Sequence, residues 1–224
     1  MLHLPGILTA EELGRIRALL TAAVWVDGRA TAGNLSHQVK DNRQADEGDP
    51  TAAEAASVVL QAVERHPLFV SAALPARISP PLFNRYAGGQ AYGAHIDGAI
   101  RPLAPGGAMR TDLSATLFLN NPDDYEGGEL QVEGREGRQS VKLPAGDMVL
   151  YDSGAIHQVT PVTRGVRLAS FFWVQSYVRR AEERGLLFNL DSQIQTLRET
   201  RPDDPLVTEL TAHYHSLLRL WAEV

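Results

Sequence analysis

The hydrophobic and polar positions divide the chain into helical ends and a middle of different texture. At the amino-terminal end, Thr9 and Glu12 have the spacing of a capping box, and the apolar residues that follow recur with a helical period to about Val24. A second helix is predicted after Asp49, which precedes a proline at the first helical position, and it ends at His66 before the next proline.

The carboxyl-terminal end returns to the helical period after Tyr177. Two apolar stripes separated by a break at residues 201–205 predict two helices. The stripes consist of Leu187, Leu190, Ile194 and Leu197, and of Leu206, Leu210, Tyr214, Leu217 and Trp221. Two apolar faces need cover, so the pattern predicts that part of segment 178–224 packs between subunits of a homo-oligomer; packing on the sheet of a monomer is the alternative.

The middle of the chain consists of short apolar or alternating runs separated by turns rich in glycine and proline. These runs predict six or more short strands, which is typical of a sandwich or jelly roll. They are PLFNRY, SATLFLN, GELQVE, SVKLP, DMVLYD and RLASFFWVQS. We therefore expect a mainly β fold with flanking helices: a helical segment 1–77 packing on the core, a core 78–177 and a helical extension 178–224.

Composition and charge exclude several classes of partner. The chain has 224 residues, of which 44% are hydrophobic and 21% charged, as in an ordinary globular domain. A net charge of −6 without a cluster of Lys and Arg predicts no nucleic-acid partner. No apolar run is long enough to span a membrane, and the first residues lack the pattern of a signal peptide, so we expect a cytoplasmic protein without a membrane partner.

The candidate chemistry lies in two histidines and one carboxylate. The chain has no cysteine, so any metal must be held by His and carboxylate ligands. His95 and Asp97 are two residues apart and point to the same side of an extended segment. Such a pair alone is more often structural, but His157 supplies a third ligand after another predicted strand. Two histidines and one carboxylate match the facial triad of non-heme Fe(II) oxygenases, although other metals also suit the spacing.

A candidate cationic residue, Arg167, follows ten positions after His157. Arg167 begins a predicted strand on which Ala169, Phe171 and Trp173 share its face. A buried arginine in this position either pairs with a distant carboxylate or binds an anionic ligand, which suggests a dicarboxylate cosubstrate. The alternative is an ordinary arginine at the surface edge of the sheet.

Stretches along nearly the whole chain resemble the 2-oxoglutarate- and Fe(II)-dependent oxygenases, in particular the bacterial PKHD-type hydroxylases related to prolyl and lysyl hydroxylases. The resemblance rests on HLPGILTAEEL, WVDGRAT, LFNRYAGGQAYGAHIDGA, MRTDLSATLFLN, YEGGEL, VKLPAGDMVLY, HQVTPVTRGVRLASFFWVQS and the helical tail. It implies a double-stranded β-helix (jelly roll) core over residues 78–177. It also implies consumption of 2-oxoglutarate and O₂, release of succinate and CO₂, and hydroxylation of a prolyl or lysyl side chain or of a small metabolite.

The resemblance assigns roles to individual residues. It implies that His95, Asp97 and His157 bind Fe(2+) and that Arg167 anchors the distal carboxylate of 2-oxoglutarate. Tyr86 and Trp173 then line the same pocket. L-ascorbate commonly keeps the iron of this family reduced, and bacterial members are often linked to iron acquisition.

Two other functions are compatible with the residues alone. The first is a non-catalytic jelly-roll binding module that has kept the fold. The second is a cupin-like enzyme that uses Mn or Zn and does not need a pocket arginine. The Pro/Gly-rich residues 99–110, directly after the ligand pair, are expected to form either a lid or a plain surface connection.

Overall fold

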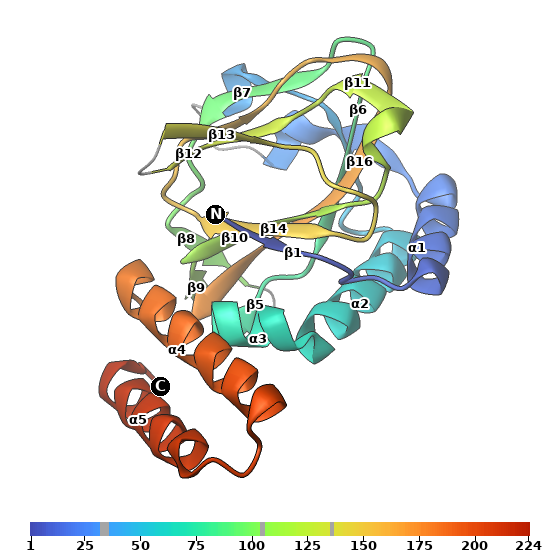
Figure 1. Ribbon diagram of the computed structural model, residues 1–224. Coiled ribbons are helices and arrows are strands. Elements are labelled where there is room, and N and C mark those ends of the chain that lie inside the picture. Colours follow the sequence, from blue (N-terminus) through green and yellow to red (C-terminus); the bar gives the residue numbers. More distant parts are fainter. Residues whose placement is uncertain (32–35, 104–105, 135–136) are drawn as a thin grey trace.

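Two antiparallel sheets face each other in the middle of the molecule, and helices lie outside the larger one (Figure 1). The structure is a computed structural model, and it describes residues 1–31, 36–103, 106–134 and 137–224. This arrangement confirms the mainly β fold with flanking helices that the sequence predicts. In the described residues, no helix is long and apolar enough to cross a membrane.

The larger sheet has nine strands in the described residues, and a seven-strand path runs in the order β1-β14-β10-β16-β6-β4-β2, with β5 and β11 also paired to β16. β10 lies within this path, between β14 and β16, and every one of its residues is buried. The strands are β1 (Leu2–Leu4), β2 (Trp25–Asp27), β4 (Arg43–Ala45), β5 (Pro75–Ile78), β6 (Leu82–Ala87), β10 (Leu113–Phe118), β11 (Tyr125–Gly127), β14 (Met148–Asp152) and β16 (Val162–Ser176).

The smaller sheet has five strands in the described residues, in the order β13-β12-β15-β7-β3. Its strands are β3 (Lys40–Asp41), β7 (Ala91–His95), β12 (Leu130–Gly134), β13 (Gly137–Val141) and β15 (His157–Val159). A separate hairpin of β8 (Ile100–Pro102) and β9 (Ala108–Arg110) follows β7 along the chain. Segment 99–110, expected to be either a lid or a plain surface connection, is thus largely this hairpin, with residues 104–105 outside the described residues.

The amino-terminal helices begin where their caps predict. α1 (Ala10–Ala22) has the reciprocal capping box of Thr9 and Glu12, and α2 (Pro50–Arg65) is capped by the Asp49 side chain. The short helix α3 (Pro67–Ala73) was not expected, because Pro67 stops one helix and also occupies the first position of the next. Apolar residues of α1, α2 and α3 pack with the larger sheet into one core, which includes Ile16, Val59, Phe69 and Phe172.

Residues 1–77 are not only helical. They also supply β1, β2 and β4 to the larger sheet and β3 to the smaller one, strands of two or three residues that are too short to show a period in the sequence. In the part of the chain that the structure describes, three short 3-10 helices span Gly28–Thr31, Ser36–Gln38 and Pro122–Asp124. The division of the chain at residues 77 and 177 stays a prediction.

Two carboxyl-terminal helices, α4 (Ala181–Thr200) and α5 (Pro205–Trp221), are present as the two apolar stripes predict. α4 packs beside α3 and buries Leu187, Ile194 and Leu197. α5 packs on α4, and none of its residues is fully buried. Polar contacts also fix this end of the chain, since Arg110 binds Glu223 with its Nη1 3.1 Å from the carboxylate.

Candidate metal centre

A cavity of about 830 Å³ lies between the two sheets and is lined by strands of both. Its size falls in the range of small-molecule binding sites. All six residues that the sequence singles out for a site contribute to its wall, although they are spread over almost ninety positions of the chain. They are Tyr86, His95, Asp97, His157, Arg167 and Trp173.

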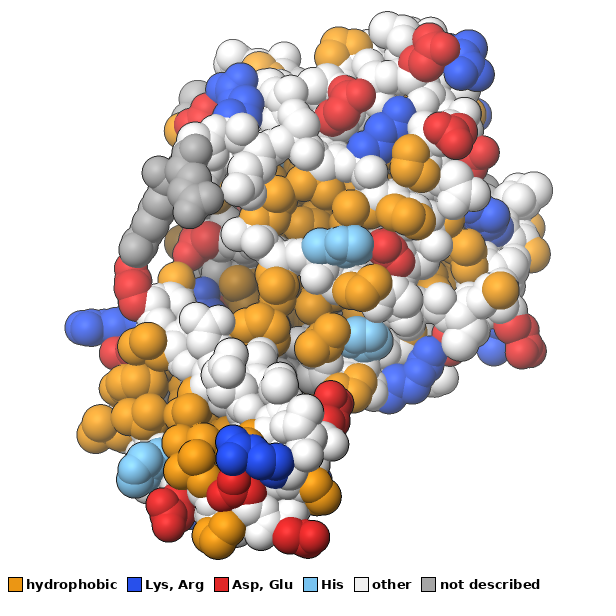
Figure 2. Space-filling model, in the orientation of Figure 1, with side chains coloured by type: hydrophobic (Ala, Val, Ile, Leu, Met, Phe, Trp, Pro, Cys, Tyr) orange, Lys and Arg blue, Asp and Glu red, His pale blue; other side chains and the backbone are white. Residues whose placement is uncertain are grey.

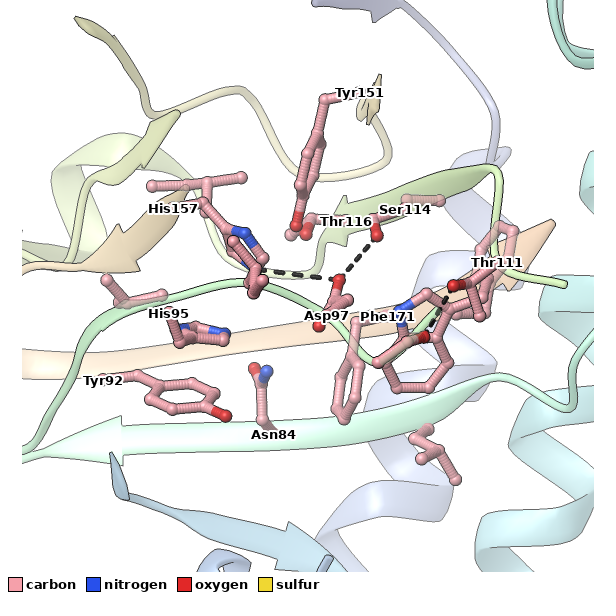
Figure 3. Close-up of a pocket in the computed structure, with 18 of the residues that line it drawn as sticks. Asn84, Tyr92, His95, Asp97, Thr111, Ser114, Thr116, Tyr151, His157 and Phe171 are labelled. Atoms are coloured by element: carbon pink, nitrogen blue, oxygen red, sulfur yellow. Dashed lines mark hydrogen bonds and ion pairs between the residues drawn. The ribbon is translucent and has the colours of Figure 1, made fainter. Parts of the chain in front are cut away.

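The two histidines face each other because their strands pair. β7 and β15 are antiparallel neighbours, and His95 and His157 occupy directly opposite positions in the register. Asp97 follows just after the end of β7, and its Oδ2 lies 3.7 Å from Nε2 of His157 (Figure 3). One ligand atom from each of the three residues lies within 4.8 Å of the other two. The two-residue spacing of His95 and Asp97 thus places both side chains near His157, as the sequence predicts.

Backbone carbonyls orient both imidazoles. Nδ1 of His95 lies 2.8 Å from the Gly93 carbonyl oxygen, and Nδ1 of His157 lies 3.0 Å from the Ala155 carbonyl oxygen. A carbonyl oxygen can only accept, so each Nδ1 donates to it, and Nε2 is the atom of each ring that is left to bind a metal. Burial, followed by the neighbouring His157, lowers the pKa of His95 to about 4, so this ring is neutral at pH 7.

The carboxylate of Asp97 is held by the buried Ser114, which in turn contacts the buried Ser153. The Ser114 hydroxyl donates to Asp97 Oδ2 at 2.6 Å, and Ser114 Oγ lies 2.8 Å from Ser153 Oγ. Ser114 comes from β10, and Ser153 follows β14. Sequence reasoning missed both serines, because nothing in their local pattern shows that strand pairing brings Ser114 to Asp97 and Ser153 to Ser114.

Arg167 is buried with only 1% of its surface exposed. Its Nε donates to the Gly128 carbonyl at 2.9 Å and its Nη1 to Asn84 Oδ1 at 3.3 Å. Its guanidinium carbon lies 5.4 Å from the ring centres of both Tyr86 and Phe118. No carboxylate of the described residues lies within ion-pair distance, so the guanidinium is held by hydrogen bonds and aromatic rings without an ion pair from the described chain. The alternative of a surface-edge arginine is wrong.

Tyr92 is a further site residue that the two-residue strand period hides. Tyr92 and His95 are three positions apart on β7, whereas their register partners on β15, Val159 and His157, are only two positions apart. This bulge brings Tyr92 to the side of His95, and the two rings stack with their centres 3.6 Å apart. Lys40, Asn84 and Arg101 also line the cavity and were not expected from the sequence.

The donor set fits a ferrous ion. Two imidazoles and one carboxylate on one side of a metal leave the remaining coordination positions to small ligands. The buried Arg167 in the same cavity is complementary to a carboxylate, and Arg forms paired hydrogen bonds with such a group. A metal on this triad and an anion on Arg167 would together suit a cosubstrate that carries one carboxylate at each end.

Comparisons with known families agree with this arrangement. The profile of the 2OG-Fe(II) oxygenase superfamily matches residues 81–175, which include all of the candidate ligands. The profile of the PKHD-type hydroxylase C-terminal domain matches residues 182–223, which correspond to α4 and α5.

Relatives and solved structures support the same family and fold. A PKHD-type hydroxylase of Burkholderia ambifaria (strain MC40-6) is 53% identical over 225 residues, covering 100% of this chain and 99% of the relative. A Pseudomonas putida prolyl-4-hydroxylase is 22% identical with a TM-score of 0.52, covering 78% of this chain and 91% of that one. A prolyl hydroxylase of Trichoplax adhaerens, solved with a peptide of hypoxia inducible factor, is 19% identical with a TM-score of 0.58. The match covers 83% of this chain and 86% of that one.

Proposed function

This chain belongs to the PKHD-type hydroxylases of the 2OG-Fe(II) oxygenase superfamily, and from that premise we propose that His95, Asp97 and His157 bind its ferrous ion. The protein is a 2-oxoglutarate-dependent dioxygenase, and Fe(2+) and 2-oxoglutarate are the cofactor and cosubstrate of its family. The further proposals concern which side chains carry these roles and what the enzyme acts on.

The observation that carries the assignment is the meeting of the His-Asp-His cluster and Arg167 in one cavity. Bound iron supplies the redox chemistry that converts 2-oxoglutarate and O₂ to succinate and CO₂ while one oxygen atom enters a substrate C–H bond. A binding module needs no such metal cluster, and a cupin-like Mn or Zn enzyme needs no Arg167. Family membership favours the oxygenase over both alternatives.

The residues of the chain position the reactants. Arg167 fixes the distal carboxylate of 2-oxoglutarate, so that the keto-acid end of the cosubstrate faces the metal ligands. Tyr86 and Trp173 form aromatic walls beside this cosubstrate. Tyr86 is buried, which raises the pKa of its phenol, so it remains a neutral hydrogen-bond donor at pH 7.

Ser114 holds Asp97 at 2.6 Å and thereby keeps the carboxylate in place for the metal. The apolar and aromatic walls restrict water near the reacting atoms, which limits loss of oxidising equivalents to side reactions. L-ascorbate is the proposed reductant that returns oxidised iron to the ferrous state.

The test of this function is succinate formation by the purified chain supplied with Fe(II), 2-oxoglutarate, L-ascorbate and O₂. Enzymes of this chemistry consume some cosubstrate without a prime substrate, so succinate should form above the level of the Asp97→Ala variant. Equal amounts from both proteins, each correctly folded, would contradict the assignment.

The prime substrate is a prolyl or lysyl side chain or a small metabolite, and a role in iron acquisition is the proposed physiological context. A deletion strain should accumulate the unmodified substrate. Its parent strain should contain the hydroxylated product, which is heavier by one oxygen atom. Mass spectrometry of metabolites and of peptides from both strains would identify the pair.

A further inference from the structure

Two cationic side chains of the cavity have no role in the proposed function. Lys40 lies on β3, at the edge of the smaller sheet, and Arg101 lies on β8, just after the metal ligands. Together with Arg167 they make three cations in the described lining of the cavity, against the single carboxylate of Asp97.

Lys40 lies one aromatic ring away from the metal centre. Its side chain is buried, with 6% of the residue exposed, and Nζ donates to Gln44 Oε1 at 2.8 Å. Nζ also lies 5.2 Å from the ring centre of Tyr92, the ring that stacks on His95. Burial lowers its pKa to about 8, so the ammonium is still mostly charged at pH 7.

Arg101 lies on β8 and also lines the cavity. Its guanidinium carbon is 4.2 Å from the ring centre of Trp173, in a cation–π contact. A cation–π contact does not use the N–H groups of the guanidinium as hydrogen-bond donors to oxygen, so they remain for an anion. Within the described part of the chain, these N–H groups have no hydrogen-bond acceptor and no ion-pair carboxylate. Glu47 acts on Arg101 electrostatically, but Glu47 is exposed and does not line the cavity.

Around the metal centre and Arg167, the positive and negative charges balance without Lys40 and Arg101. A ferrous ion and Arg167 together carry as much positive charge as 2-oxoglutarate and Asp97 carry negative charge. Lys40 and Arg101 therefore add two positive charges to a partly buried site. Arg101 also opposes the charge on Lys40, an effect that comes after burial and Asp97 among the influences on the Lys40 pKa.

We propose that Lys40 and Arg101 bind an anionic group of the prime substrate, a carboxylate or a phosphate, and hold the rest of the substrate over the metal centre. This inference rests on the proposed function, because the charge balance assumes that iron and 2-oxoglutarate occupy the site. The cavity of about 830 Å³ must also hold 2-oxoglutarate, so the substrate part that enters it is small.

The test measures binding rather than turnover. Protein loaded with Fe(II) and 2-oxoglutarate without oxygen is titrated calorimetrically with two pairs of probes that differ in charge. N-acetyl-L-proline and N-acetyl-L-prolinamide represent a carboxylate and its neutral form, whereas phenyl phosphate and phenol represent a phosphate and its neutral form. We expect the anionic member of at least one pair to bind at least about tenfold more tightly. The pair that shows this preference identifies the anion.

Three variants locate the preference. In the double variant Lys40→Gln/Arg101→Gln the anion should bind no better than its neutral partner, and in Arg101→Gln alone the preference should fall by about threefold or more. Arg138→Gln is the matched control, since it removes an exposed cation from the smaller sheet away from the cavity and should leave the preference intact. The single Arg101 variant keeps the test valid if the buried Lys40 position does not tolerate glutamine.

Three results would overturn the inference: equal binding within both pairs, no binding by either anion, or an undiminished preference in Arg101→Gln. The affinity for 2-oxoglutarate is measured first on the same samples. If iron and 2-oxoglutarate do not bind, the proposed function fails and takes the inference with it. If they bind and the probes show no charge preference, only the inference fails.

Discussion

The cavity walls combine apolar residues with several buried polar groups, whereas the carboxyl-terminal helix pair packs mainly through apolar residues. Around the cavity, polar residues such as Ser114 and Arg167 are 2% and 1% exposed, and each has defined hydrogen-bond partners. The helix pair is held chiefly by apolar side chains: α4 buries Leu187 completely, whereas α5 has no fully buried residue. Hydrophobic side chains gather at the lower left of Figure 2, where α4 and α5 lie in Figure 1.

This difference separates the cavity residues, which serve binding and catalysis, from the apolar residues of α4 and α5, which serve packing. Buried polar groups cost free energy unless their partners are in place, so a change at the cavity should alter function sharply. Apolar contacts at the tail are less directional, so a change there should alter stability or association and leave ligand binding by the folded protein intact. The two regions therefore predict different outcomes for similar substitutions.

The largest expected effect is at the metal ligands. His95→Ala, Asp97→Ala or His157→Ala should each abolish 2-oxoglutarate-dependent succinate release, because each removes one of the chain's proposed iron ligands. Circular dichroism should show a retained fold, since the strand core does not depend on the ion. His213→Ala, an exposed histidine on α5, should retain activity. Full activity in one of the three ligand variants would remove that residue from the site.

Next in size is the change at Arg167. Arg167→Ala should weaken 2-oxoglutarate binding by on the order of 2–5 kcal/mol, and Arg167→Lys should recover only part, because lysine lacks the planar fork. The measurement is the Michaelis constant for 2-oxoglutarate in succinate release. Arg164→Ala is the control: it lies on the same strand, but its side chain is exposed and paired with Glu126. An unchanged constant in Arg167→Ala would make this arginine purely structural.

At the tail, adjacent leucines offer a matched pair. Leu187 is completely buried, whereas Leu186 is 58% exposed. Leu187→Ala should lower the free energy of unfolding by about 2–5 kcal/mol, and Leu186→Ala should change it by less than about 0.5 kcal/mol. Denaturant unfolding measures both values. The affinity of folded Leu187→Ala for 2-oxoglutarate should match that of the unaltered chain, and a large loss would show that the tail shapes the cavity.

A smaller effect on metal affinity is expected at Ser114. Ser114→Ala removes the hydroxyl that donates to Asp97 and should weaken Fe(II) binding by about tenfold or more. Ser170→Ala is the control, because the Ser170 hydroxyl is buried without a hydrogen-bond partner in the described structure. Competition with a chromophoric chelator gives both affinities. Equal affinities in the two variants would mean that Ser114 does not position Asp97.

The smallest effect concerns association of the chain. Leu206 and Leu220 on α5 are 41% and 74% exposed, and we propose that this face contributes to a homo-oligomer. Light scattering at tens of micromolar should show a species larger than the monomer, and Leu220→Ser should reduce its amount. A chain ending at Tyr177 should not associate through this face. A monomeric full-length chain would contradict the oligomer, whatever the truncation does.

The sequence predicted those parts of the structure that depend on local pattern. Thr9 and Asp49 begin α1 and α2 because a cap is a contact between near neighbours. The triad could be proposed because His95 and Asp97 are close in sequence and share a side of the chain. The position of His157 opposite His95 depends on strand pairing over sixty residues and became evident only in the fold.

The remaining site residues depend on register and burial, which local pattern does not contain. Tyr92 reaches His95 through a bulge that breaks the two-residue period. Lys40 belongs to a two-residue strand that shows no period at all. Arg167 was equally compatible with a surface position until the packing of Tyr86 and Phe118 around it was known.

The most direct test of the account is the visible absorption spectrum of the protein titrated without oxygen. Fe(II) followed by 2-oxoglutarate should produce a weak charge-transfer band that saturates at one equivalent of each per chain and needs both. Asp97→Ala should not show it, and Arg167→Ala should require much more 2-oxoglutarate. A folded protein that gives no band with Fe(II) and excess 2-oxoglutarate would contradict the assignment of this cavity as the oxygenase site.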